Sequence, residues 1–231
     1  MNYKIKLIPL FILFFILSFP LLASAQTFYS NCVVTKVGNP ANAPALPPEC
    51  ATGDLTLPPN LGVENPTHPG YFQMPASTDD SYNLYTCRNR NWGSRELISV
   101  VYSVAKRWKT KYPQGRINIG DLNAVDHKSH NWGRAVDLDA TTNGKDWVSD
   151  YTKGSYNRQA TIELGQMFVD TEKVLNIWYN DQAVNNAVLS YSKASGKSKG
   201  MVMHPIEGHD NHYHLDVRQT PEKLSFWTPD C

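Results

Sequence analysis

Six of the seven histidines in this chain lie in two short stretches that also contain carboxylates. The first stretch covers residues 127–139 and the second covers residues 204–216. Imidazole and carboxylate groups are the usual ligands of catalytic zinc, which takes about three protein ligands and leaves one position for water. A zinc ion lowers the pKa of that water and polarises a substrate carbonyl, so the two stretches indicate a hydrolytic metal site.

The favoured ligand set is His130, Asp137 and His214, which leaves His212 beside the metal-bound water to move protons. His130 and Asp137 are seven residues apart with Gly133 between them, which suits a loop that leads into a strand. His212 and His214 flank a single residue, so both can face one site from a strand. On ligand type alone, copper, nickel and the iron of a two-histidine, one-carboxylate site are alternatives to zinc.

The other histidines and carboxylates near these stretches have plainer interpretations. His204 and His68 do not lie at a ligand-type spacing, and no direct role is expected for either. Asp139 and Asp216 could either orient the ligands or serve as structural carboxylates. The prediction of a metal centre therefore depends on the favoured set.

Strict alternation of side-chain character predicts two strands that position these groups, over residues 134–140 and 212–218. In each strand a metal-competent row faces one way and an apolar row faces the other. Helical spacing predicts helices over 95–112 and about 160–171, and a third helix capped by Asp181. Shorter apolar runs predict strands over 116–119 and 174–179, and residues 192–200 are expected to form a polar loop. The fold class is therefore predicted to be α+β, in one domain over residues 70–231.

Residues 1–25 are predicted to be a secretory signal peptide. Lys4 and Lys6 precede an apolar run from Leu7 to Leu22, and a small-residue cleavage site ends at Ala25. No cysteine follows that site, so no lipid or membrane anchor is expected after cleavage. The mature chain is thus predicted to be periplasmic or secreted.

The charge balance of the chain gives no indication of a strongly basic binding surface. There are 22 Lys plus Arg against 21 Asp plus Glu, for a formal net charge of +1. Nucleic acid is therefore not expected as a partner.

The cysteines and the N-terminal part of the mature chain are interpreted as structural. Four cysteines in an exported chain predict two disulfides, with three possible pairings, of which Cys32–Cys50 with Cys87–Cys231 is preferred. Residues 26–69 are rich in proline and are expected to be an extended segment that lies on the following domain.

The two stretches also resemble a known superfamily. The segment Ser129–Leu138, followed by His212-Tyr213-His214, is similar to the LAS zinc metallopeptidases. Within that superfamily the chain most resembles the penicillin-insensitive murein endopeptidases, over residues 70–218. The more specific part of the resemblance is the paired pattern His127-x-x-His130 and His209-x-x-His212-x-His214.

The resemblance implies a LAS/hedgehog-like fold, with a central, mostly antiparallel sheet flanked by helices, and one zinc ion per chain. It matches the zinc ligands to His130, Asp137 and His214. It matches His212 to the residue that acts on the zinc-bound water, and His209 and His127 to further active-site residues that bind substrate or stabilise the oxyanion. The implied reaction is hydrolysis of peptide cross-links of the D-alanyl–diaminopimelyl type in bacterial peptidoglycan.

Two alternatives to an endopeptidase stay open. A zinc carboxypeptidase of the D-Ala-D-Ala type shares the first motif, but it places a glutamate base three residues before the final histidine, where this chain has Asn211. The second alternative is a non-catalytic, zinc-containing cell-wall-binding module. Such relatives usually lose a ligand or the base, and this chain retains both. No oligomeric state is predicted.

Overall fold

The computed structural model describes residues 55, 57–58, 61–86, 90–124, 129–130, 132–218, 224 and 227. All of them belong to one of the two units into which the chain divides, Thr35–Cys231. The predicted signal peptide, most of the proline-rich segment, all four cysteines with their predicted pairing, and His127 lie outside the described residues.

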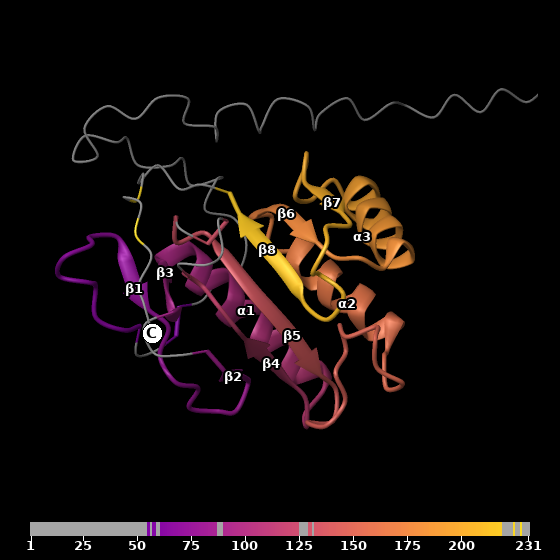
Figure 1. Ribbon diagram of the computed structural model, residues 1–231, viewed down its shortest axis with the longest axis horizontal. Coiled ribbons are helices and arrows are strands. Elements are labelled where there is room, and N and C mark those ends of the chain that lie inside the picture. Colours follow the sequence, from indigo (N-terminus) through magenta and orange to yellow (C-terminus); the bar gives the residue numbers. More distant parts are fainter. Residues whose placement is uncertain are drawn as a thin grey trace, which may run out of the picture. The chain divides into compact units, whose positions relative to one another are not determined.

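The central element is a mixed six-stranded sheet (Figure 1). Its strands, in spatial order, are β2 (Tyr82–Leu84), β4 (Arg116–Ile119), β5 (Ala135–Thr141), β8 (Tyr213–Val217), β6 (Val174–Trp178) and β7 (Val202–His204). The three inner pairings are antiparallel and the two outer ones are parallel. The α+β class is confirmed, while antiparallel pairing within this sheet is confined to its four inner strands.

Three helices flank this sheet: α1 (Arg95–Lys111), α2 (Arg158–Val169) and α3 (Gln182–Ser195). Each begins at a polar side chain that accepts a hydrogen bond from a backbone N–H of the first turn. These N-caps are Ser94, Asn157 and the predicted Asp181. The last helix extends to Ser195, so it takes up the start of the predicted polar loop.

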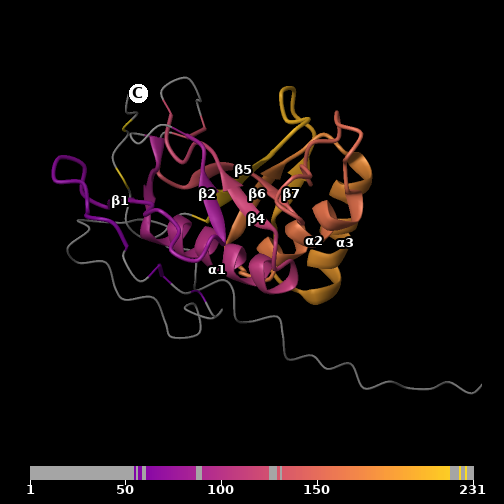
Figure 2. The same ribbon diagram turned by 90° about the horizontal axis from the view of Figure 1, so that it is seen from below.

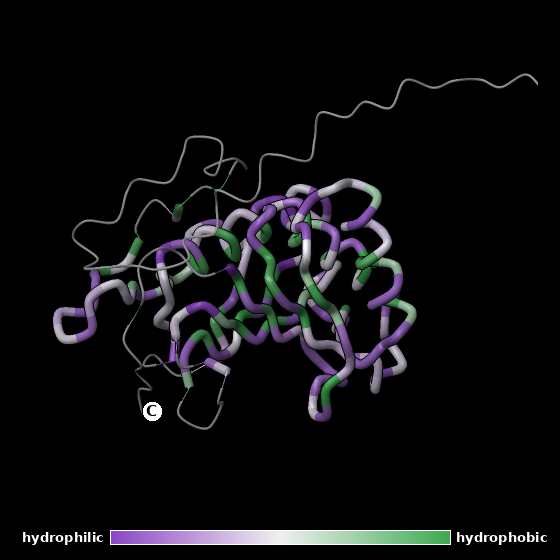
Figure 3. Tube along the Cα trace, turned by 90° about the horizontal axis from the view of Figure 1, so that it is seen from above, coloured by the Kyte–Doolittle hydropathy of each residue, from purple (hydrophilic) through white to green (hydrophobic). Residues whose placement is uncertain are grey.

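The helices all lie on one face of the sheet (Figure 2). The apolar rows predicted for β5 and β8 are buried in the hydrophobic core together with side chains of the helices. Figure 3 shows green, hydrophobic segments along the central strands and purple ones on the outer turns. Because burial of one Val or Leu side chain contributes about 1.5–3 kcal/mol, this layer fixes which way both strands face.

The opposite face of the sheet carries the metal-competent rows. Cross-strand neighbours share a face, and the register places Asp137 opposite His214, which in turn lies opposite Trp178. Two residues further along β8, on the same face, Asp216 lies opposite Asn176. The predicted division of each strand into an apolar and a polar row is therefore confirmed.

Four strands of three residues each were not predicted. They are β1 (Tyr71–Gln73) and β3 (Trp92–Ser94), which form a separate antiparallel pair, and the two edge strands β2 and β7. Three residues are too short to show a periodic pattern, so only tertiary pairing reveals them. Among the described residues, no helix is both long enough and apolar enough to cross a membrane.

Candidate metal centre

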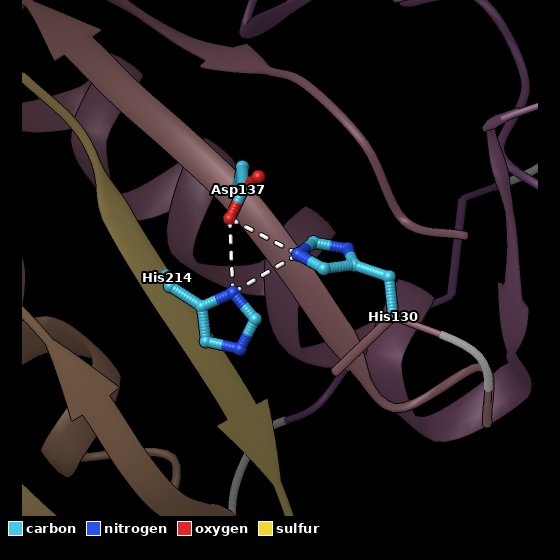
Figure 4. A group of neighbouring side chains, drawn as sticks. All are labelled: His130, Asp137 and His214. Atoms are coloured by element: carbon cyan, nitrogen blue, oxygen red, sulfur yellow. Dashed lines mark hydrogen bonds and ion pairs between the residues drawn. The ribbon is translucent and has the colours of Figure 1, made fainter. Parts of the chain in front are cut away.

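Three predicted ligands converge on the polar face of the sheet (Figure 4). The Nε2 atom of His130 lies 2.9 Å from Nδ1 of His214 and 3.2 Å from Oδ1 of Asp137. The His214 Nδ1 atom is 3.0 Å from the same Asp137 oxygen. All three side chains are buried. We call His130, Asp137 and His214 the inner group.

Strand register and one tight turn bring the inner group together. Asp137 and His214 are direct neighbours on the antiparallel strands β5 and β8. His130 precedes a turn at Gly133, where the backbone has a φ of +62°. The carbonyl of Gly133 accepts a hydrogen bond from the N–H of Ser94, and a Cβ there would lie 2.8 Å from the ring of Tyr71. Glycine is therefore required at this turn, and the turn leads His130 back over the sheet.

The donor atoms of the inner group fit a small divalent ion. Zinc binds imidazole nitrogen and carboxylate oxygen at about 2.0–2.2 Å in a tetrahedral arrangement, which separates its ligand atoms by about 3.3–3.5 Å. The three observed separations, 2.9, 3.0 and 3.2 Å, are close to that value. The inner group is thus a set of His and Asp side chains that could hold a metal ion.

The imidazole of His214 is held on two further sides. Its Nε2 atom lies 3.7 Å from Oδ2 of Asp216, which favours a proton on Nε2 and a lone pair on Nδ1. Trp178 stacks on its ring, with centroids 4.2 Å apart and an interplanar angle of 14°. Burial alone would lower the pKa of His214, but the hydrogen bond to Asp137 and the carboxylate of Asp216 outweigh burial and raise it to about 9. A bound cation would take the place of that proton.

His209 and His212 lie beside the inner group and are partly exposed. The Nε2 atom of His212 is 3.6 Å from Oδ1 of Asp137. The ring centroid of His209 is 5.1 Å from that of His212 and 5.7 Å from that of His214. Burial and the neighbouring His214 lower the pKa of His209, so this side chain is mainly neutral near pH 7. We call His209 and His212 the outer histidines.

The loop that carries the outer histidines is anchored to two other segments. Asn180, after β6, donates from Nδ2 to Oδ1 of Asp210, and its Oδ1 accepts from the N–H of Ile206. Tyr151 donates its hydroxyl proton to the same oxygen of Asp210, at 2.7 Å. The backbone N–H of Asn180 also donates to the carbonyl of His209. These contacts set where the outer histidines stand relative to the strands.

The structure brings together five of the predicted site residues: His130, Asp137, His209, His212 and His214. The sixth, His127, lies outside the described residues. His204 is an exposed residue of β7, and His68 stacks on Trp227 with centroids 4.4 Å apart. Among the described residues, neither belongs to a group of possible metal ligands.

The sequence reasoning missed the residues that support the site from neighbouring segments. Trp178 lies in the predicted strand 174–179, but its contact with His214 requires that β6 pair with β8. Asn180 and Tyr151 hold the histidine loop although they are far from it in sequence. No spacing rule links such residues to a site.

Comparison with models of known protein families gives no match, and no curated protein matches the chain in sequence.

Proposed function

We propose that this protein is an exported, zinc-dependent murein endopeptidase that hydrolyses peptide cross-links of the D-alanyl–diaminopimelyl type in bacterial peptidoglycan. The observation that carries the proposal is the convergence of the inner group, whose donor atoms lie 2.9–3.2 Å apart, with His212 next to it. A hydrolytic metal site needs this combination of a closed ligand set and an adjacent base. The substrate class rests on the resemblance of the two histidine motifs to those of murein endopeptidases.

His130, Asp137 and His214 would hold the ion, and a zinc ion bound there would acidify water and polarise the carbonyl of the scissile peptide. His212 would take a proton from the attacking water. Its Nδ1 lies 2.6 Å from Oδ1 of Asn211, so Nδ1–H donates there and Nε2 keeps the lone pair that accepts the proton. The same proton then passes to the nitrogen of the leaving amine as the peptide C–N bond breaks.

His209 would contact the substrate as a hydrogen-bond acceptor. Its Nδ1 lies 3.2 Å from two backbone carbonyls, those of Ile206 and Glu207, so Nδ1–H donates to the main chain. The remaining Nε2 then carries a lone pair, which suits a peptide N–H better than an oxyanion. His127 is proposed as a further substrate-contacting residue from the motif alone.

Digestion of purified, cross-linked sacculi followed by mass spectrometry of the muropeptides tests the proposal. An endopeptidase converts dimeric muropeptides into monomers. A carboxypeptidase removes only a terminal D-alanine, and a binding module leaves the muropeptides unchanged, so either of these results contradicts the proposal. Removal of metal with EDTA is expected to abolish cleavage, and cleavage that persisted would contradict a metal mechanism.

The variant His212→Ala separates metal binding from proton transfer. Loss of a general base typically reduces turnover by about 10²–10⁴-fold, while the inner group stays complete. We therefore expect His212→Ala to bind zinc as the wild type does and to lose turnover by that factor. Activity retained by this variant would rule out the role proposed for His212.

A further inference from the structure

We propose that Asp137, His209 and His212 form a second divalent-metal site, which shares the Asp137 carboxylate with the inner group and is occupied at higher metal concentration. One ligand atom from each of these three residues lies within 4.8 Å of the others. The closest approach is the 3.6 Å between Nε2 of His212 and Oδ1 of Asp137. Two imidazoles and a carboxylate are a sufficient set of protein ligands for an ion of the zinc class.

The tautomers of the outer histidines make both of them competent as ligands. Backbone carbonyls accept the Nδ1–H of His209, and the Asn211 side chain accepts the Nδ1–H of His212. A metal ligand must present a nitrogen lone pair, and a hydrogen bond at the other ring nitrogen is the usual way to fix which nitrogen presents it. In both rings that nitrogen is therefore Nε2, and Nε2 of His212 already lies next to the carboxylate of Asp137.

The shared carboxylate makes the two groups adjacent halves of one centre. Asp137 has two oxygens, and carboxylates commonly bridge ions about 3.5–4 Å apart in two-metal sites. One oxygen, Oδ1, faces both histidines of the inner group. The same oxygen is the Asp137 atom that lies 3.6 Å from Nε2 of His212, so one carboxylate faces both groups of histidines.

We call the proposed second site, formed by Asp137, His209 and His212, the outer site. It is expected to bind its ion more weakly than the inner group does. Its histidines lie on a loop and are partly exposed, with 21% of the His212 side chain accessible, so water can complete the coordination. Its ligand atoms must also move closer, because up to 4.8 Å exceeds the separation of about 3.3 Å that zinc imposes. An ion in the inner group would further repel a second cation.

Occupation of the outer site has a functional consequence that rests on the proposed function. An ion on Nε2 of His212 takes the lone pair that would accept the proton of water. Excess zinc should therefore inhibit hydrolysis, although the inner group remains filled. The outer site would thus be an inhibitory metal site.

Counting bound ions tests the second site without any assay of activity. The purified protein is stripped with a chelator and titrated with Zn²⁺, with native mass spectrometry to count ions and calorimetry to measure affinity. We expect a tight first step and a weaker second step in the wild type and in the control His204→Ala. In His209→Ala and His209→Gln we expect the second step to disappear and the first to remain. A wild type that binds one ion, or a second ion that both His209 variants retain, overturns the proposal.

A measurement on the wild type alone guards against variants that fail to fold. Two Co²⁺ ions that share a carboxylate are magnetically coupled, so the electron paramagnetic resonance signal per ion should change between the first and second equivalents. An unchanged signal per ion contradicts the shared carboxylate. A single bound ion together with cleavage of sacculi would contradict the second site and leave the proposed function intact. Two bound ions without cleavage would support the second site and contradict the proposed function.

Discussion

The inner group and the outer histidines are adjacent, but they are held in different ways. Asp137 and His214 belong to paired strands whose other faces are buried in the core, so their positions follow from sheet register and packing. His209 and His212 belong to a loop and a strand end, and polar contacts from Asn180 and Tyr151 hold the loop. The core of the domain therefore positions Asp137 and His214, whereas polar contacts of a loop position the outer histidines, and segments held by few buried apolar contacts are the more mobile ones.

Removal of a strand-borne ligand should have the largest effect on this centre. In His214→Ala the ion loses one of three protein ligands, and the buried Asp137 loses a hydrogen-bond partner. We expect the metal content, measured by plasma mass spectrometry, to fall to background and cleavage of sacculi to be lost with it. His204→Ala, a change of an exposed histidine on β7, should leave both unchanged. Zinc retained by His214→Ala would show that the inner group is not the principal site.

A second carboxyl on β5 shows what distinguishes the inner group from the rest of its strand. Asp139 is as buried as Asp137, but its Oδ1 accepts from the backbone N–H of Ser149 instead of facing imidazoles. Burial raises the pKa of Asp139 to about 7. Between pH 4 and about 7 the folded protein therefore binds a proton that the unfolded chain releases, and the free energy of unfolding falls as pH rises.

The isosteric variant Asp139→Asn removes this pH dependence. In metal-free protein, urea titrations at several pH values measure the free energy of unfolding. Relative to the wild type, the free energy of unfolding of the variant should rise by up to about 1.4 kcal/mol per pH unit across that window. The raised pKa of His214 affects both proteins equally and acts in a higher window, from 6.5 to about 9. If the free energies of unfolding of the two proteins differed by a constant amount from pH 4 to 7, the pKa of Asp139 would not be raised.

A smaller effect is expected from the carboxylate that orients His214. The variant Asp216→Asn keeps the shape of the side chain but removes the charge that lies 3.7 Å from Nε2 of His214. Loss of such a partner typically weakens metal affinity by about 10–100-fold. Competition with a chromogenic chelator measures this loss, and an affinity equal to that of the wild type would make Asp216 a purely structural carboxylate.

The inner group could be predicted from the sequence because its signals are local. Alternation along two strands places Asp137 and His214 on polar rows, and the spacing of His130 to Asp137 indicates the loop that joins them. The sequence could not show that β6 lies next to β8, which places Trp178 on the ring of His214. Strand order depends on packing across the whole domain, and no short segment contains it.

The contacts that anchor the histidine loop could not be predicted from the sequence for a related reason. Asp210 is close to both outer histidines in sequence, but its partners, Tyr151 and Asn180, come from separate segments. A tyrosine hydroxyl on a carboxylate is too common a contact to be inferred from residue types. Only the folded chain shows that this contact supports the outer histidines and not the inner group.

The variant Tyr151→Phe tests that distinction with the smallest expected effect. It removes the 2.7 Å hydrogen bond from the Tyr151 hydroxyl to Asp210 and leaves both strands unchanged. A single hydrogen bond contributes about 1 kcal/mol, so we expect a loss of that order in loop stability and a fall in turnover of less than about tenfold. Metal content should be unchanged, because no ligand of the inner group depends on this contact.

The chain offers a matched control for Tyr151→Phe on the helix side of the molecule. The hydroxyl of Tyr191 donates to Oδ1 of Asp170 at 2.8 Å, and neither residue contacts the metal centre. Tyr191→Phe should therefore lower the free energy of unfolding by a similar amount and leave turnover unaffected. If both variants lost turnover equally, the effect would come from overall stability, and the loop contact would have no specific role. A fall in turnover confined to Tyr151→Phe, at constant zinc content, would mean that the outer histidines depend on their loop anchor while the inner group does not.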